Sequence, residues 1–131
     1  MSGIIGLINV SAATVGASEV KSIWVENVSS TSRVTLITPT SGTKVRIISA
    51  NLISTSSNIC AQEVYFGTGT NITTTPANAI YEGTTDADHT PSLIGVWPDG
   101  GGPVGAVDAV VSIRANHSVN SNRWIVQYRE E

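Results

Sequence analysis

Apolar residues along this chain come in short runs, and no stretch has the 3.6-residue spacing of an amphipathic helix. The runs are rich in β-branched residues and are bounded by clusters of Gly, Pro, Asn, Ser and Thr, which is the pattern of strands joined by turns. Eight or nine short strands at this spacing predict an antiparallel β-sandwich, and they fit a jelly roll. The clearest segments are 22–29, 33–38, 43–54, 60–68, 79–82, 93–97, 106–114 and 123–129.

The longest segment, 43–54, changes its buried face along its length. Val45 and Ile47 share one parity, whereas Ile48, Ala50 and Leu52 share the other. Such a change is expected from a β-bulge, or from a strand that crosses from one sheet to another.

With 131 residues and 13.7 kDa, the chain is large enough for one hydrophobic core and too small for two ordinary domains. It contains no fixed-period repeat and no linker that would separate domains. We therefore expect one β-sandwich domain over residues 21–131, preceded by an N-terminal arm or edge strand over residues 1–20.

The composition argues against two classes of binding partner, nucleic acids and membranes. Only 13% of the residues are charged, and 7 basic against 10 acidic residues give a net charge of −3. Nucleic-acid binding needs clustered Lys and Arg, so we expect no nucleic-acid partner. We also expect no membrane partner, because no apolar run approaches the roughly 18 residues of a membrane span.

The N-terminus carries four large apolar residues without a basic leader, so we expect it to belong to the mature protein. Apolar side chains at a chain end are costly to leave in water, so this segment should dock on protein. It forms either an edge strand of its own domain or an arm that packs on a neighbouring subunit. The candidate interface residues here are Ile4, Ile5, Leu7 and Ile8.

Trp97 lies at a predicted strand end, next to Pro98 and a run of glycines. It is a further candidate for a subunit or capsid interface, and its alternative role is to close one end of the core. An exposed aromatic residue of this kind, Trp97 or Tyr81, would also serve a carbohydrate-binding module.

Two further patterns resemble ligand sites by their letters alone. The glycines at 100, 102 and 105 match G-x-G-x-x-G, but an alternating strand pattern follows where a dinucleotide site needs a helix, so we expect a wide turn. Asp86 and Asp88 beside His89 could share a cation, but they lack the further oxygens of a calcium loop. We expect a solvated loop there.

Catalytic groups are scarce. The chain contains two histidines, His89 and His117, and the single cysteine Cys60 within a strand pattern. No nucleophile elbow of the G-x-S-x-G type is present. We expect no enzymatic activity, no metal and no cofactor.

Four stretches together resemble small structural proteins encoded among the head genes of tailed bacteriophages. They are residues 41–49 (SGTKVRIIS), 64–69 (VYFGTG), 97–105 (WPDGGGPVG) and 126–131 (VQYREE). The resemblance covers roughly residues 41–131. In strand and turn style, this part of the chain is similar to head-decoration, or cement, proteins.

The resemblance implies a mechanical function. Such proteins are β-rich domains that sit on the outer capsid surface, often as trimers, and clamp neighbouring subunits of the major capsid protein. It therefore implies a homo-oligomer, with a trimer favoured, located on the virion and made in the host cytoplasm. The alternative is a phage tail, neck or fibre component with a receptor- or carbohydrate-binding sandwich.

Overall fold

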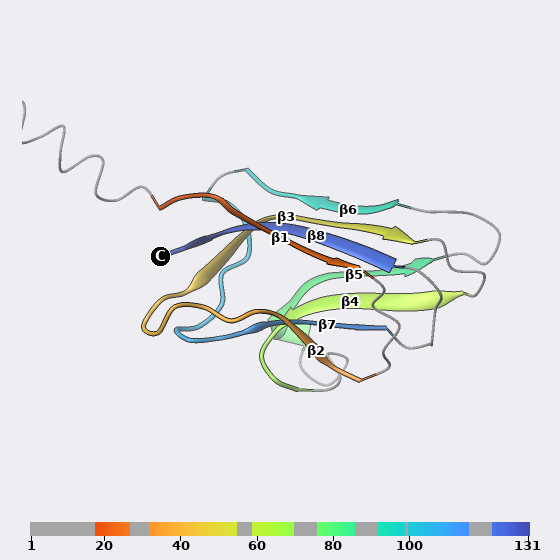
Figure 1. Cartoon of the computed structure of the whole chain (residues 1–131), viewed down its shortest axis with the longest axis horizontal. Helices are drawn as coiled ribbons and strands as arrows, with labels where there is room; N and C mark the ends of the chain where they lie inside the picture. The colour runs from red at the N-terminus through yellow and green to blue at the C-terminus, as the bar shows by residue number, and fades with distance from the viewer. Residues whose placement is uncertain are drawn as a thin grey trace, which may run out of the picture.

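A computed structural model shows two four-stranded antiparallel sheets packed face to face (Figure 1). The described part of the chain comprises residues 18–26, 32–54, 59–69, 76–85, 92–98, 100–115 and 122–131. Within it the regular elements are strands, apart from the short 3-10 helix η2 (Pro76–Asn78). The predicted all-β sandwich is confirmed.

Every predicted strand segment contains a strand. In chain order they are β1 (Lys21–Glu26), β2 (Val34–Ile37), β3 (Val45–Ser54), β4 (Cys60–Phe66), β5 (Ala79–Thr85), β6 (Ser92–Val96), β7 (Val111–Ala115) and β8 (Asn122–Glu130). The N-terminal candidates Ile4, Ile5, Leu7 and Ile8 lie outside the described residues.

The strand order is that of a rolled-up hairpin. One sheet, called here the β1 sheet, has the order β1-β8-β3-β6, and the other, the β2 sheet, has the order β2-β7-β4-β5. The antiparallel pairs β1–β8, β2–β7, β3–β6 and β4–β5 are those of one long hairpin bent at its middle. Rolling it up adds the pairs β3–β8 and β4–β7 and divides the strands between two sheets. Eight strands in this arrangement form a jelly roll.

The core lies between the sheets and is filled by alternate residues of each strand. On β8, Trp124 and Val126 are fully buried, whereas Gln127, the residue after Val126, is exposed. Each fully buried large apolar side chain contributes about 1.5–3 kcal/mol relative to exposure. The buried cluster consists of Leu36, Ile37, Val45, Ile47, Ala50, Leu52, Val64, Phe66, Ile80, Val111, Ile113, Trp124 and Val126.

A β-bulge at Ile48 divides β3, as one of the two alternatives from the sequence predicted. The register of β3 against β8 shifts directly after Ile47. Because the extra residue reverses the parity, Val45 and Ile47 before it and Ala50 and Leu52 after it all face the core at 0% exposure. Ile48 itself is half-buried.

The two halves of β3 have different neighbours at the edge of the sheet. After the bulge, β3 pairs with β6. Before it, the segment 102–105 takes that place: the Ile47 amide donates to the Pro103 carbonyl at 2.9 Å, and the Gly105 amide donates to the Val45 carbonyl at 3.0 Å. The long connection between β6 and β7 is thereby held along β3.

The predicted strand over residues 106–114 was wrong in its first half. The strand β7 begins at Val111, and a turn precedes it in which the Ala109 amide donates to the Ala106 carbonyl at 3.1 Å. Asp108 in this turn has a φ of 62°, which no pleated strand adopts. The alternation of apolar and polar residues continued through the turn and resembled a strand.

The strand β5 is longer than predicted. Its pairing with β4 continues past Glu82, through Gln62–Gly83 to Cys60–Thr85. Ladder pairing with β4 holds the polar residues 83–85 extended, although the pattern of apolar residues predicted the end of the strand at residue 82.

Candidate interaction surface

The outer face of the β1 sheet gathers side chains from four strands. The register places Trp24 beside Ile125, and Ile125 beside Asn51. We call this surface the Trp24 face. Its members are Ser22, Trp24, Glu26, Ser49, Asn51, Ile53, Val96, Arg123, Ile125 and Gln127.

Large apolar side chains on the Trp24 face are open to solvent. Trp24 is 53% exposed, Ile53 43% and Val96 67%. Ile125, between Trp24 and Asn51 in the register, is half-buried. A single exposed apolar residue is ordinary, but several on one sheet face are typical of surfaces that contact protein.

The charges on the Trp24 face neutralise one another. Arg123 Nη2 donates to Glu26 Oε1 at 2.9 Å. The same guanidinium lies over the Trp24 ring, with its central carbon 5.4 Å from the ring centroid, which is a cation–π distance. The other polar members of the face carry hydroxyl or amide groups. This surface therefore loses water at a lower cost than one with unpaired ions.

The outer face of the β2 sheet is built differently, because the turn after β4 folds over it. The Tyr65 hydroxyl donates to the Gly69 carbonyl at 2.6 Å, and Ser112 Oγ donates to the Gly67 carbonyl at 2.7 Å. Tyr65 is left only 2% exposed. Burial raises the pKa of its phenol, the charge of Glu63 adds to the rise, and nearby arginines oppose it.

The rest of the outer face of the β2 sheet carries charged side chains. Arg33 donates to the hydroxyls of Thr35 and Ser112, and Arg114 lies 3.5 Å from the Glu63 carboxylate. Among the described residues, none of the exposed large apolar side chains comes from β2, β7, β4 or β5. The two faces of the sandwich are thus chemically distinct, and the Trp24 face is the apolar one.

Trp97, the candidate interface residue, turns toward the interior. A Cβ added to Gly95 would lie 2.9 Å from both the Trp97 ring and the Tyr81 ring. Both aromatic residues are partly buried against the core. Gly95 therefore makes room for them, in agreement with the alternative in which Trp97 closes one end of the core. A role of Trp97 at an interface stays a prediction.

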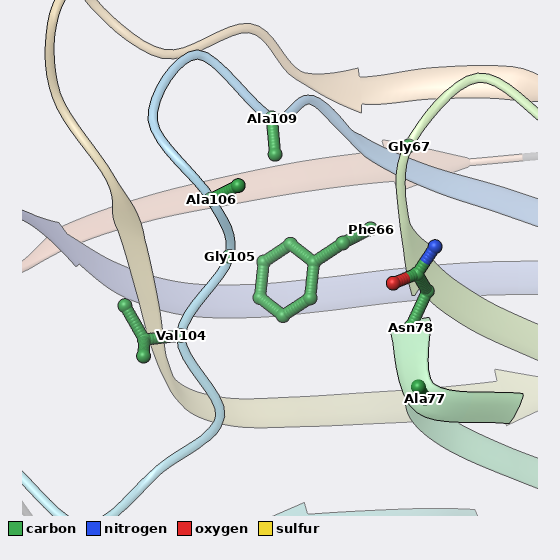
Figure 2. A pocket seen from close by; sticks show the side chains of 8 residues that line it. All are labelled: Phe66, Gly67, Ala77, Asn78, Val104, Gly105, Ala106 and Ala109. Atoms are coloured by element: carbon green, nitrogen blue, oxygen red, sulfur yellow. The ribbon is translucent and has the colours of Figure 1, made fainter.

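A small pocket of about 190 Å³ lies where the end of β4 meets the connection that precedes β7. Figure 2 shows the Phe66 ring at its centre, with Gly105 and Asn78 on either side. Its lining residues are Phe66, Gly67, Ala77, Asn78, Val104, Gly105, Ala106 and Ala109. This lining contains no acid, base or nucleophilic side chain, so it offers no catalytic group.

The glycines of the G-x-G-x-x-G segment allow this segment to pack closely against its neighbours. A Cβ on Gly102 would lie 1.8 Å from the Ile47 carbonyl oxygen, and one on Gly105 would lie 2.7 Å from the Phe66 ring. Gly100 has a φ of 85°, in the region that glycine favours. A turn and then β7 follow, so the predicted turn is confirmed and the segment lacks the helix of a nucleotide site.

Several sequence candidates fall outside the described residues, namely Asp86, Asp88, His89 and His117. Cys60 begins β4, but its side chain is not among those described. Within the described ranges, no three His, Cys, Asp or Glu residues come together as a metal site. No helix in the described part of the chain is long and apolar enough to span a membrane.

The residues that define the Trp24 face were missed by sequence reasoning. One signal was present: Trp24 alternates with Ile23 and Val25, so it faces away from them. Since Ile23 and Val25 pack against the core, Trp24 has to face outward. The exposure of Ile53 and Val96 depends on the bulge and on the pairing of β6, which a single sequence does not reveal.

Sequence comparison finds no matching family model and no matching curated protein. Among solved structures, the chain is similar to a subunit of Bacillus endospore appendages, described as disulfide-linked pili, with 8% identity, a TM-score of 0.45, and coverage of 87% of this chain and 89% of that chain.

The chain is also similar to the virus-like particle of extra small virus from the giant freshwater prawn Macrobrachium rosenbergii, with 11% identity, a TM-score of 0.42, and coverage of 86% of this chain and 79% of that one. A chain of infectious bursal disease virus has 11% identity and a TM-score of 0.27, with 86% of this chain and 30% of that chain covered.

Proposed function

We propose that this chain is a non-enzymatic structural protein of a virion that binds the outer surface of a bacteriophage capsid as an oligomer and stabilises the shell. The observation that carries the proposal is the Trp24 face, where large apolar side chains are exposed and the one ion pair is self-neutralised. Its occupant is the major capsid protein. The phage assignment rests on the resemblance in strand and turn style given above.

The size of the Trp24 face requires several copies to act together. Three rows of residues across four strands cover about 20 Å by 20 Å, or about 400 Å². A stable protein–protein interface buries about 800 Å² on each partner. One copy therefore binds weakly, whereas an oligomer that engages several sites at once dissociates far more slowly. This is the physical reason for an oligomer in the proposal.

Cryo-electron microscopy of particles from the source of this sequence tests the proposal. We expect density for the sandwich on the outer shell in hundreds of copies, with the Trp24 face toward the capsid. Absence of the chain from the outer shell would overturn it.

Binding of the purified chain to particles that lack it tests the surface. The double variant Trp24→Ser/Val96→Ser should bind at least tenfold more weakly than the natural chain. Val107→Ser is the matched control, because Val107 is also 50% exposed but lies in the turn before β7, away from this face. Equal binding by the double variant would remove the Trp24 face from the proposal.

One observation favours the second candidate, a tail, neck or fibre component that binds carbohydrate. An exposed aromatic ring with amide neighbours is a stacking platform for sugars, and Trp24 lies diagonally across from the exposed Gln127. Glycan-array binding that is lost in Trp24→Ala, together with dozens of copies per particle, would favour this candidate.

A further inference from the structure

We propose that residues 4–10 of one copy pair as an additional strand along the free edge of β1 in a second copy. The inference deepens the proposed function, since it rests on the oligomer invoked there and supplies its contact. It concerns the edge of the β1 sheet, which borders the capsid-binding Trp24 face.

The strand β1 leaves apolar surface open at this edge. It is paired with β8 on one side and is terminal in its sheet among the described strands (Figure 1). Ile23 and Val25 pack against the core but are only half-buried, and Trp24 on the opposite face is 53% exposed. An additional strand beside β1 would cover apolar side chains on both faces.

The charged residues of β1 do not protect its free edge. Edge strands are commonly guarded against pairing by charged side chains, proline or bulges. Here Lys21 Nζ lies 2.9 Å from Glu130, and Glu26 lies 2.9 Å from Arg123. Both partners belong to β8, so these charges are engaged on the paired side of β1, and its register with β8 is regular throughout.

The edges of the other sheet, at β2 and β5, are less suitable. The strand β2 has four residues and an irregular register near Thr35. The outward positions of β5 include Glu82 and Thr84, which are polar and exposed. The edge at β1 combines length, regular register and open apolar surface.

Residues 4–10 have the composition of a strand that is covered on both faces. Ile4 and Ile8 share one parity, and Ile5 and Leu7 share the other, so both faces are apolar. Residues 1–18 contain no charged side chain. Seven residues extend over about 23 Å, which matches the six residues of β1. One face would extend the layer of Ile23 and Val25, and the other would lie beside Trp24.

The connection between the two segments favours a second copy over the same chain. Hairpin loops usually have two to five residues, whereas ten residues, 11–20, separate this segment from β1. They contain no proline and no Asn-Gly or Asp-Gly turn. Ten extended residues reach about 33 Å, which is enough to leave one domain and meet the edge of the next.

Self-association of the purified full chain, with no capsid present, tests this inference separately from capsid attachment. We expect an oligomer by light scattering, and slow hydrogen exchange at β1 amides that depends on protein concentration. Leu7→Asp/Ile8→Asp should raise the dissociation constant at least tenfold and speed exchange in β1. Ala12→Asp/Ala13→Asp, with the same added charge in the connection, is the matched control and should behave like the natural chain.

Chemical cross-linking keeps the test decisive if the aspartate variant folds poorly. In a Cys60→Ser background, a chain with Leu7→Cys is mixed with a chain with Ser22→Cys and treated with a bismaleimide. We expect cross-links between the two different chains. An unchanged oligomer in the aspartate variant overturns the inference. A monomer whose β1 is protected by its own N-terminal segment also overturns it, because the pairing would then lie within one chain.

Discussion

Gly102 faces the backbone carbonyl of Ile47 so closely that an added Cβ would lie 1.8 Å from the carbonyl oxygen. This approach lets segment 102–105 run beside the first half of β3 and form the hydrogen bonds Ile47 N–Pro103 O and Gly105 N–Val45 O. The glycine run is therefore a packing requirement of the β3 edge.

Gly102→Ala should destabilise the domain, because the connection has to move away from β3 and lose these hydrogen bonds. We expect a loss of about 3 kcal/mol, which lowers the Tm by about 10 °C for a chain of this size. Gly69→Ala is the matched control, since a Cβ there meets nothing within 4 Å. Thermal unfolding measures both, and equal melting of Gly102→Ala and the natural chain would contradict the prediction.

Asp108 should tolerate asparagine but not alanine. Its backbone has a φ of 62°, and its Oδ1 accepts a hydrogen bond from the Gly42 amide at 2.6 Å. Asparagine keeps the acceptor and tolerates this conformation, so Asp108→Asn should stay within about 0.5 kcal/mol of the natural chain. Asp108→Ala should cost about 2 kcal/mol through the lost hydrogen bond and the strained backbone. Urea unfolding distinguishes them, and equal losses would refute this account.

Glu130 should make the stability of the domain depend on pH on the acid side. Hydrogen bonds from Lys21 and then from Thr40 lower the pKa of its carboxyl group from 4.5. A group with a lowered pKa in the folded state stabilises the fold above its unfolded pKa, and this contribution is lost as the pH falls through the folded value. Glu130→Gln should therefore be less stable than the natural chain at pH 7, and this difference should shrink as the pH falls toward 3.

Salt concentration provides a control for the effect of Glu130→Gln on stability. The Lys21–Glu130 pair is partly exposed, so 1 M NaCl at pH 7 should reduce the difference between Glu130→Gln and the natural chain. Urea unfolding at both pH values measures it. A difference that persists unchanged at pH 3 would show that the carboxylate charge is not its cause.

Truncation should destabilise the fold far more at Trp124 than at Trp24. Trp124 is fully buried, so Trp124→Ala should cost about 3–5 kcal/mol. Trp24 is 53% exposed and contacts Arg123, so Trp24→Ala should cost about 1 kcal/mol or less. Denaturant unfolding of the two variants checks this difference. A large loss in Trp24→Ala would mean that Trp24 supports the fold and does not serve an external partner.

Strand positions were predictable because their signal is local. Alternation located most of the strands, and the change of parity in segment 43–54 predicted either a bulge or a crossing between sheets, of which the structure contains the bulge. The same rule failed at residues 106–110, where apolar residues alternate but Asp108 takes a left-handed conformation that the pattern does not report. Alternation describes which side chains share a face, and it does not distinguish a strand from an irregular turn with similar spacing.

The site could be predicted only in part. The sequence indicated an interface protein of low charge, but it pointed to Trp97, whose ring lies with Tyr81 over Gly95 against the core. The exposed tryptophan is Trp24. Both residues have flanking sequences compatible with exposure, and both lie in or next to a terminal strand of the β1 sheet. They differ because Trp24 is on the outer face of β1, whereas Trp97, directly after β6, packs against the core.

The sequence by itself determined an all-β sandwich, nearly all of its strands and the change of buried face within segment 43–54, because these follow from side-chain alternation and turn residues within a few positions. Only the tertiary structure decided that β1 is terminal in its sheet among the described strands, that the turn after β4 covers the outer face of the β2 sheet, and that Gly102 packs on Ile47. These features depend on contacts between segments far apart in the chain. Which apolar residues remain open to a partner depends on how the hairpin rolls up, whereas the local pattern indicates only which residues of a strand share a face.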